Sequence, residues 1–151
     1  MAWRVDLRIP RRLSRQVDRR RLRKAALAAL APHTAADQGQ VTVVLIGDAE
    51  MQDLNRRFRD RDSSTDVLAF EAGIGPGPEP ATAPPYLGDV IISHERALEQ
   101  ALELGHPLMR ELEILIIHGV LHLLGFDDET PEARDQMWRA QEEVLRRLEA
   151  E

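Results

Sequence analysis

The alternation of apolar and polar residues along the chain predicts four strands. Residues 3–9 alternate in polarity, which is typical of a strand with one buried face. Residues 41–47 are β-branched and continuously apolar, which indicates a strand covered on both faces. Two further apolar runs complete the set, at residues 66–72 and 86–93.

Longer segments with helical periodicity predict about five helices. Their expected ranges are 13–31, 48–58, 94–104, 109–124 and 131–151. Residues that start or stop helices flank these ranges, namely Pro32, Asp48, Ser93, Gly105, Gly125, Thr130 and Pro131. Asp48 and Ser93 are expected to act as N-caps. The order of the elements predicts an α+β fold: a single domain over residues 1–151, in which an about four-stranded mixed sheet packs with about five helices around a central buried helix.

Proline and glycine interrupt this pattern between residues 73 and 85. The stretch holds five of the nine prolines and three of the nine glycines, so it can neither pair inside a sheet nor continue a helix. Too little chain precedes it to form a separate domain. We therefore interpret it as a mobile surface loop within the single domain.

Composition narrows the classes of protein that the chain can belong to. The chain has no cysteine, so any bound metal must be held by histidine, aspartate or glutamate. No apolar run approaches the ~20 residues of a membrane span, and the charged start is unlike a secretory signal. We therefore expect a cytoplasmic protein that does not contact a membrane.

Charge is distributed unevenly along the chain, whose net charge is -6. Residues 1–24 hold ten Arg or Lys and two Asp, a net charge of +8, so the remaining chain carries -14. Such a basic arm can contact RNA or an acidic partner. The alternative is that it forms the solvated face of a helix, because Leu13, Val17, Leu22, Ala26 and Leu30 recur beneath it at near-helical spacing.

Two histidines lie four residues apart in the apolar stretch "HGVLHLLGFDDET". Side chains at this spacing lie on one face of a helix, so His118 and His122 can converge on one metal ion. Gly125 can end the helix in a left-handed turn and return Asp127 or Asp128 beneath the histidines as an oxygen ligand. Nitrogen and carboxylate ligands together favour one Zn²⁺ ion with an open position for water. The alternative is a pair of core histidines that bond only to protein groups.

This stretch resembles the signature of the YbeY family of bacterial metal-dependent endoribonucleases, His-Gly-x-Leu-His-Leu-x-Gly-(Tyr/Phe)-Asp-His. Two other blocks are similar to the family's sequence, at residues 54–71 and 87–93. The resemblance implies a zinc-dependent, single-strand-specific endoribonuclease that processes ribosomal RNA, matures the 3′ end of the small-subunit rRNA and takes part in ribosome quality control. It also implies single-stranded rRNA and the small ribosomal subunit or assembly factors as partners. The oligomeric state stays open.

The resemblance also assigns residues. The family's important arginine falls on Arg59, whose planar guanidinium suits a phosphate. The family's third metal histidine falls on Asp128 here, which leaves Asp128, Asp127 or water as the third ligand beside His118 and His122.

Two other functions are compatible with the motif. A zinc protease is disfavoured because Gly119 occupies the position at which such enzymes carry a glutamate base. A non-catalytic ribosome-assembly module with structural zinc would bind rRNA through the basic arm and need no open coordination site.

Overall fold

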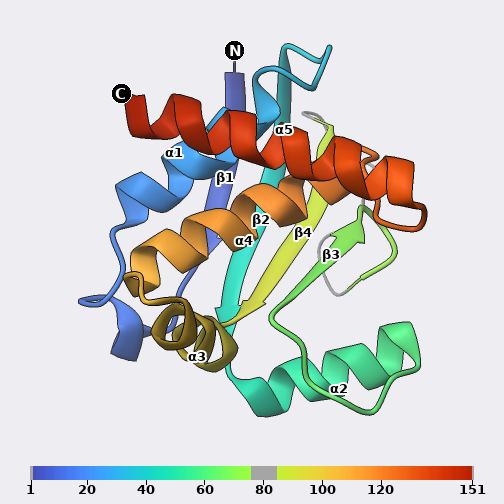
Figure 1. The fold of residues 1–151 in the computed structure, drawn as a ribbon. Helices are drawn as coiled ribbons and strands as arrows, with labels where there is room; N and C mark the ends of the chain where they lie inside the picture. The colour runs from blue at the N-terminus through green and yellow to red at the C-terminus, as the bar shows by residue number, and fades with distance from the viewer. Residues whose placement is uncertain (1, 76–84, 151) are drawn as a thin grey trace.

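The structure is a computed structural model and describes residues 2–75 and 85–150 (Figure 1). The strands are β1 (Ala2–Arg8), β2 (Gln38–Ile46), β3 (Val67–Glu71) and β4 (Tyr86–Ser93). The helices are α1 (Arg19–Leu30), α2 (Asp48–Arg59), α3 (His94–Leu104), α4 (Leu108–Leu123) and α5 (Pro131–Ala150), with a short 3₁₀ turn at Arg11–Leu13. The expected α+β fold with four strands and five helices is confirmed.

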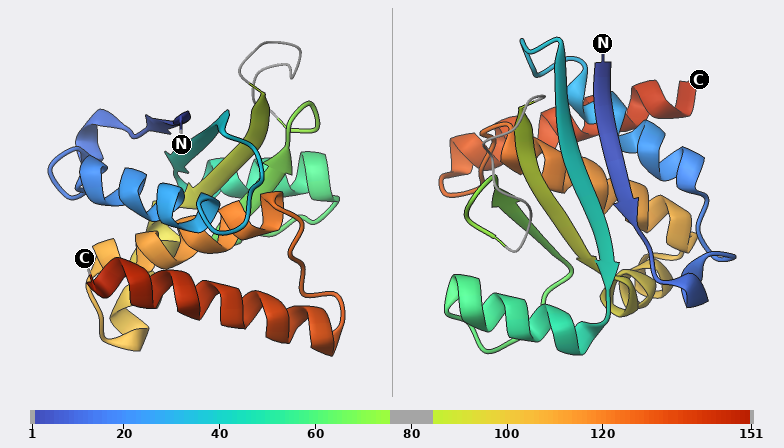
Figure 2. Two further views of the ribbon diagram at one scale, coloured as in Figure 1. Left: turned by 90° about the horizontal axis from the view of Figure 1, so that it is seen from above. Right: turned by 180° about the vertical axis from the view of Figure 1, so that it is seen from behind.

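The four strands form one mixed sheet in the order β1-β2-β4-β3. β1 and β4 run parallel to β2, whereas β3 is an edge strand antiparallel to β4. The helices α1, α4 and α5 lie on one face of the sheet, and α2 lies near the ends of the strands (Figures 1 and 2). α4 contacts β3, β4, α1, α3 and α5, so the expected central helix is confirmed.

Alternation along β2 divides the core between the two faces of the sheet. Val41, Val43 and Leu45 belong to the large core that also includes the apolar side chains of α1, α4 and α5. Ile46 joins a smaller core with Met51 of α2 on the other face. Because α4 is enclosed by the large core, the side chains that it presents toward β3 are held on a rigid base.

The first helix begins later than its hydrophobic pattern predicts. Leu13 and Val17 are buried as expected, but they lie in the 3₁₀ turn and the connection before α1. The carboxylate of Asp18 accepts hydrogen bonds from the backbone N–H groups of Arg20 and Arg21 and caps the helix there. The predicted start at residue 13 is therefore wrong, because a side-chain cap at residue 18 satisfies the first free N–H groups.

Asp48 also has a different role from the predicted N-cap. Gly47 is the N-cap of α2 and offers no side-chain bond. The Oδ1 atom of Asp48 instead accepts hydrogen bonds from the hydroxyls of Ser64 and Ser93 and from Nε of Arg96. Asp48 thus joins α2 to the loop before β3, the end of β4 and α3.

The remaining helix ends follow the sequence signals. Ser93 accepts a hydrogen bond from the backbone N–H of Arg96, and Thr130 accepts one from that of Ala133. Gly105 and Gly125 adopt positive φ angles of 71° and 105°, at which a side chain would be strained.

The predicted loop at residues 73–85 falls mostly outside the described residues. Gly73 and Ile74 form a turn after β3, and the chain is described again from Pro85, just before β4. In the described ranges, none of the helices combines the length and the apolar character that a bilayer crossing requires.

Replacing Asp48 by alanine tests its role as a link between elements. The hydrogen bond from Ser64, opposed by burial and assisted by Arg96 and Ser93, holds the pKa of Asp48 below its ordinary value of 3.8. We expect Asp48→Ala to lower the free energy of unfolding at neutral pH by about 1–2 kcal/mol, a range reduced for a side chain that is 34% exposed.

The pH dependence of that loss identifies its cause. A carboxylate with a lowered folded-state pKa stabilises above its unfolded pKa, and this contribution is lost as the pH falls through the folded-state pKa. Urea unfolding of the wild type and Asp48→Ala should therefore converge below pH 3.8. Asp53→Ala is the control and should have a smaller effect, because the partners of Asp53, Arg56 and Arg57, lie on the same helix and link no other element. A difference that persists unchanged at acid pH would contradict an ionic role.

Candidate active site

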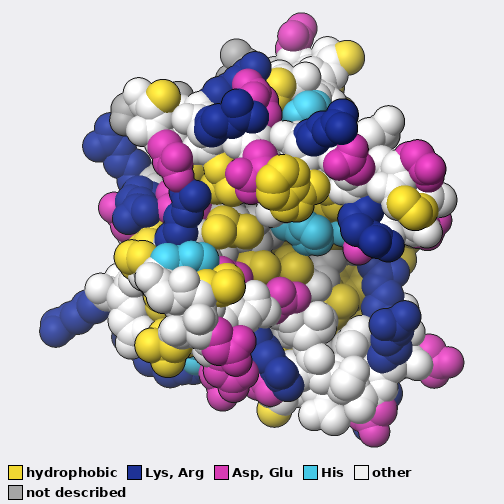
Figure 3. All heavy atoms as spheres, viewed as in Figure 1, with side chains coloured by type: hydrophobic (Ala, Val, Ile, Leu, Met, Phe, Trp, Pro, Cys, Tyr) yellow, Lys and Arg dark blue, Asp and Glu magenta, His cyan; other side chains and the backbone are white. Residues whose placement is uncertain are grey.

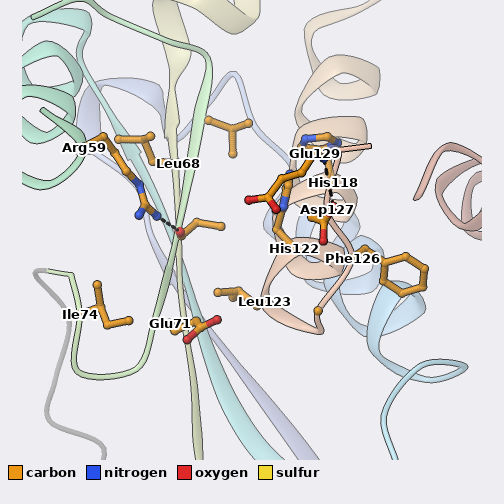
Figure 4. Close-up of a pocket in the computed structure, with 14 residues that line it drawn as sticks. Arg59, Leu68, Glu71, Ile74, His118, His122, Leu123, Phe126, Asp127 and Glu129 are labelled. Atoms are coloured by element: carbon orange, nitrogen blue, oxygen red, sulfur yellow. Dashed lines mark hydrogen bonds between the residues drawn. The ribbon is translucent and has the colours of Figure 1, made fainter. Parts of the chain in front are cut away.

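A cavity of about 550 Å³ opens between α4 and the edge strand β3. α4 supplies His118, Gly119 and His122 to one wall, and β3 supplies the opposite wall through Val67, Leu68, Ala69 and Glu71. The segment after α4 adds Asp127 and Glu129, and Arg59 reaches in from the end of α2 (Figure 4). The sequence motif and the predicted arginine are therefore brought to one cavity from opposite sides.

The two histidines lie one above the other on α4, as their spacing predicts. Their ring centroids are 4.7 Å apart and their planes are inclined by 77°. Both rings line the cavity and are half-buried. Nδ1 of His118 lies 3.0 Å from Oε1 of Gln141 on α5, a contact that the local sequence pattern does not predict.

Gly119 allows α4 to approach the sheet closely. A Cβ atom at this position would lie 2.5 Å from Cγ1 of Val90 on β4 and 3.0 Å from its Cγ2. Val90 is fully buried, and its β-branched side chain has few alternative rotamers. A glutamate at residue 119 therefore has no room, which gives the glycine of the motif a packing function.

The surroundings of His122 lower its pKa and so favour the neutral imidazole. Burial lowers the pKa of His122 most, and the neighbouring His118 lowers it further. Asp128, the backbone of Phe126 and Asp127 act in the opposite direction. A neutral imidazole has a free ring nitrogen, the form that binds a metal.

The chain turns back toward the cavity after α4. The backbone N–H of Phe126 bonds to the carbonyl of Leu121, and Gly125 provides the positive φ that the turn needs. Asp127 lines the cavity, and its Oδ1 accepts a hydrogen bond from the backbone N–H of Glu129 at 3.0 Å. Asp128 is exposed and lies outside the lining, whereas Glu129 lines the cavity and is not predicted from the sequence.

The residues of the cavity fit a zinc ion in part. The two imidazoles offer nitrogen ligands on one face of α4, and the segment after the helix brings the carboxylates of Asp127 and Glu129 to the same cavity. As the side chains stand, no three His, Asp or Glu residues of the described chain come together closely enough to hold a metal. A third protein ligand from the 127–129 segment would have to move toward the histidines, and the identity of the third ligand, a carboxylate or water, stays a prediction.

Arg59 is fixed on the opposite wall of the cavity. It is the last residue of α2, and Asp60 turns the chain after it with a φ of 56°. Its Nη2 donates a hydrogen bond of 2.6 Å to the carbonyl of Ala69, and its guanidinium carbon lies 4.7 Å from the ring centroid of Phe70. These contacts orient the guanidinium while leaving other N–H groups free to bind an anion.

Figure 3 shows histidine colour in the recessed middle of one face, with Lys and Arg side chains interspersed with Asp and Glu around it. Apart from His118 and His122, the chain has three histidines, and each of them contacts a side chain outside the cavity's histidine pair. His33 packs edge-on against Phe126, His94 contacts Arg12, and His106 contacts the buried Glu111 at 2.7 Å.

Comparison with known proteins decides the family. The sequence model of the family described as Endoribonuclease YbeY matches residues 10–149. The chain belongs to the YbeY endoribonuclease family. It is 44% identical over 126 residues to Endoribonuclease YbeY of Bacillus licheniformis, an alignment that covers 79% of this chain and 78% of that protein. It is 39% identical over 147 residues to the Roseiflexus protein of the same name, covering 95% and 92% of the two chains.

A solved structure supports the family's fold. The solution structure of a Thermotoga maritima protein aligns with 97% of this chain and 92% of its own, with a TM-score of 0.58 and 24% sequence identity. At that identity the likeness concerns the fold alone.

The packing of Gly119 can be tested by adding a methyl group. Alanine gains about 1 kcal/mol over glycine in a helix, but overpacking a core costs about 1–3 kcal/mol. Since the added Cβ would lie 2.5 Å from Cγ1 of Val90, we expect the steric cost to win. Gly119→Ala should therefore lower the free energy of unfolding, by up to about 2 kcal/mol after the helix preference is subtracted, as measured by urea denaturation.

The matched background for this test is Val90→Ala, which removes the two clashing methyl groups. In that background Gly119→Ala should become stabilising, because the helix preference of alanine is then unopposed. An equal loss in both backgrounds would show that the contact with Val90 does not explain the glycine.

Proposed function

We propose that this protein is a zinc-dependent, single-strand-specific endoribonuclease that processes ribosomal RNA. The observation that carries the proposal is the cavity of a YbeY-family chain, with two imidazoles on one wall and a fixed guanidinium on the other. Small-subunit rRNA with an unprocessed 3′ end is the proposed substrate, and ribosome quality control is the proposed wider role. The small ribosomal subunit or its assembly factors are the proposed partners, in the cytoplasm.

Arg59 is proposed to bind the phosphodiester. Cleavage concentrates negative charge on the phosphoryl oxygens, and a planar guanidinium can donate two parallel hydrogen bonds to them. Since the Ala69 carbonyl and the Phe70 ring already hold the side chain, little conformational entropy is lost when the phosphate binds.

His118, His122 and Asp128 are proposed to hold the zinc ion. When bound, zinc would polarise a phosphoryl oxygen or lower the pKa of a bound water. Both aspartates raise the pKa of His122, Asp128 by more than Asp127, although only Asp127 lines the cavity in this structure. The carboxylate of Asp127 already accepts a hydrogen bond within its own turn.

An open cavity of this size supports a single strand as the substrate. Unpaired nucleotides can enter a recess between a helix and an edge strand, whereas bases in an RNA duplex are stacked and paired. The helix α1, which carries a run of basic residues, packs against β1, at the opposite edge of the sheet from β3 (Figure 1). These basic residues could support binding to rRNA at a distance from the cavity.

The protease function loses support from the packing of Gly119. A glutamate base at this position would meet Val90, and the other carboxylates near the histidines follow the helix. The binding module with structural zinc makes a different prediction, because its RNA contacts would be on α1 and would not need Arg59.

Cleavage assays with metal-loaded protein test the proposal. A single-stranded fragment from the 3′ end of small-subunit rRNA should be cut by the wild type, and a chelator should abolish cleavage. We expect Arg59→Ala and His118→Ala each to reduce the rate at least about 100-fold, the range of lost transition-state donors. Arg59→Lys should recover little, because lysine lacks the planar fork.

The controls separate the three functions. In a parallel reaction, casein replaces RNA as the substrate. Arg23→Ala is the control for Arg59→Ala, because it also removes one positive charge but lies on α1, away from the cavity. RNA binding without cleavage that depends on Arg23 and not on Arg59 would favour the module. Casein cleavage would favour the protease. Chelator-resistant RNA cleavage would overturn the zinc-dependent nuclease.

Metal analysis tests the third ligand. We expect Asp128→Ala to lower zinc occupancy of the purified protein more than Asp127→Ala, because the carboxylate of Asp127 already accepts a hydrogen bond from the backbone N–H of Glu129. His122→Ala is the positive control, and circular dichroism confirms that each variant is folded. Equal losses for the two aspartates, or the reverse order, would overturn the assignment.

A further inference from the structure

A glutamine on the last helix contacts one of the two cavity histidines. Gln141 lies on α5, and its Oε1 is 3.0 Å from Nδ1 of His118. α5 crosses over α4 on the side away from the sheet (Figure 1). Met137 and Val144, the neighbours of Gln141 on the same helical face, are buried in the core, so packing fixes the place from which the amide reaches His118.

The contact determines which nitrogen of His118 carries the proton. The amide oxygen of glutamine can only accept a hydrogen bond, so Nδ1 of His118 must donate. A neutral imidazole has one N–H group, and Nε2 is then left with a free lone pair. His118 lines the cavity, where that lone pair is available to a ligand.

We propose that Gln141 is a positioning residue that holds His118 in the Nδ1–H tautomer with Nε2 available to the metal. Histidines that bind metals commonly donate their other N–H to an oxygen in this way, which fixes the ring and strengthens the metal bond. The inference rests on the proposed zinc site, and it extends that site from α4 and the following turn to α5.

Two substitutions of Gln141 separate its hydrogen bond from its shape. Gln141→Leu keeps a side chain of similar size and removes the acceptor, whereas Gln141→Glu keeps an acceptor oxygen. Gln136→Leu is the matched control, because it makes the same change at an exposed position of the same helix.

The tautomer can be measured without metal. Long-range ¹H–¹⁵N NMR spectra of the metal-free protein at a pH of about 8, above the ordinary imidazole pKa, distinguish the two tautomers of His118. The wild type, Gln141→Glu and Gln136→Leu should show the Nδ1–H form. Gln141→Leu should shift toward the Nε2–H form that imidazole prefers in water. An Nε2–H tautomer in the wild type would overturn the proposal.

Zinc affinity provides the second readout, measured by competition with a chromophoric chelator. Gln141→Leu should weaken zinc binding about 10–100-fold, as the loss of such outer contacts does. Gln141→Glu and Gln136→Leu should bind zinc within a few-fold of the wild type. Unchanged affinity in Gln141→Leu would overturn the positioning role.

The same titration separates this inference from the zinc site on which it rests. If His118→Ala leaves zinc affinity unchanged, the proposed zinc site is wrong, and the role of Gln141 toward a metal fails with it. If His118→Ala abolishes binding and Gln141→Leu does not weaken it, the zinc site stands and the role of Gln141 alone is overturned.

Discussion

The close approach of α4 to β4 sets the position of the whole site. Gly119 makes this approach possible, because any side chain there would meet Val90. Most of the buried side chains of the helix are apolar, and it is enclosed by α1, α3, α5 and the sheet. With α4 held at this distance, the two histidines face the edge strand β3 across the cavity. Because they are four residues apart, both imidazoles lie on this face of the helix, where they can bind one ion.

The opposite wall depends on interactions that link distant parts of the chain. Asp48 joins the start of α2 to Ser64 in the loop that leads to β3, and to Ser93 and Arg96 beyond β4. Arg59 at the other end of α2 is held by the backbone and ring of β3 itself. The two walls of the cavity are therefore supported by different parts of the chain. A substrate bound between them would contact the histidines of α4 on one side and the guanidinium of Arg59 on the other.

Much of this architecture could be predicted because its signals are local. Ser93, Gly105, Gly125 and Thr130 lie at the helix ends that their chemistry predicts, and β4 has the predicted bounds. The apolar spacing continues from Leu13 to Leu30 and predicts one helix over this range, but Asp18 caps the helix so that it begins at Arg19. The partners of Asp48 and Gln141 could not be foreseen, since they lie 16 or more residues away in sequence. The spacing of His118 and His122 predicted their pairing, but only the fold brings Arg59 and Glu129 to the same cavity.

The central claim is that one RNA strand binds between α4 and β3. The most direct test is NMR mapping of the labelled protein as single-stranded RNA from the 3′ end of small-subunit rRNA is added, in the presence of zinc and with a non-cleavable linkage. The account predicts that signals of the Arg59 guanidinium, His118 and the amides of β3 shift together with one affinity. Shifts confined to the basic face of α1, with the cavity signals unchanged, would contradict it.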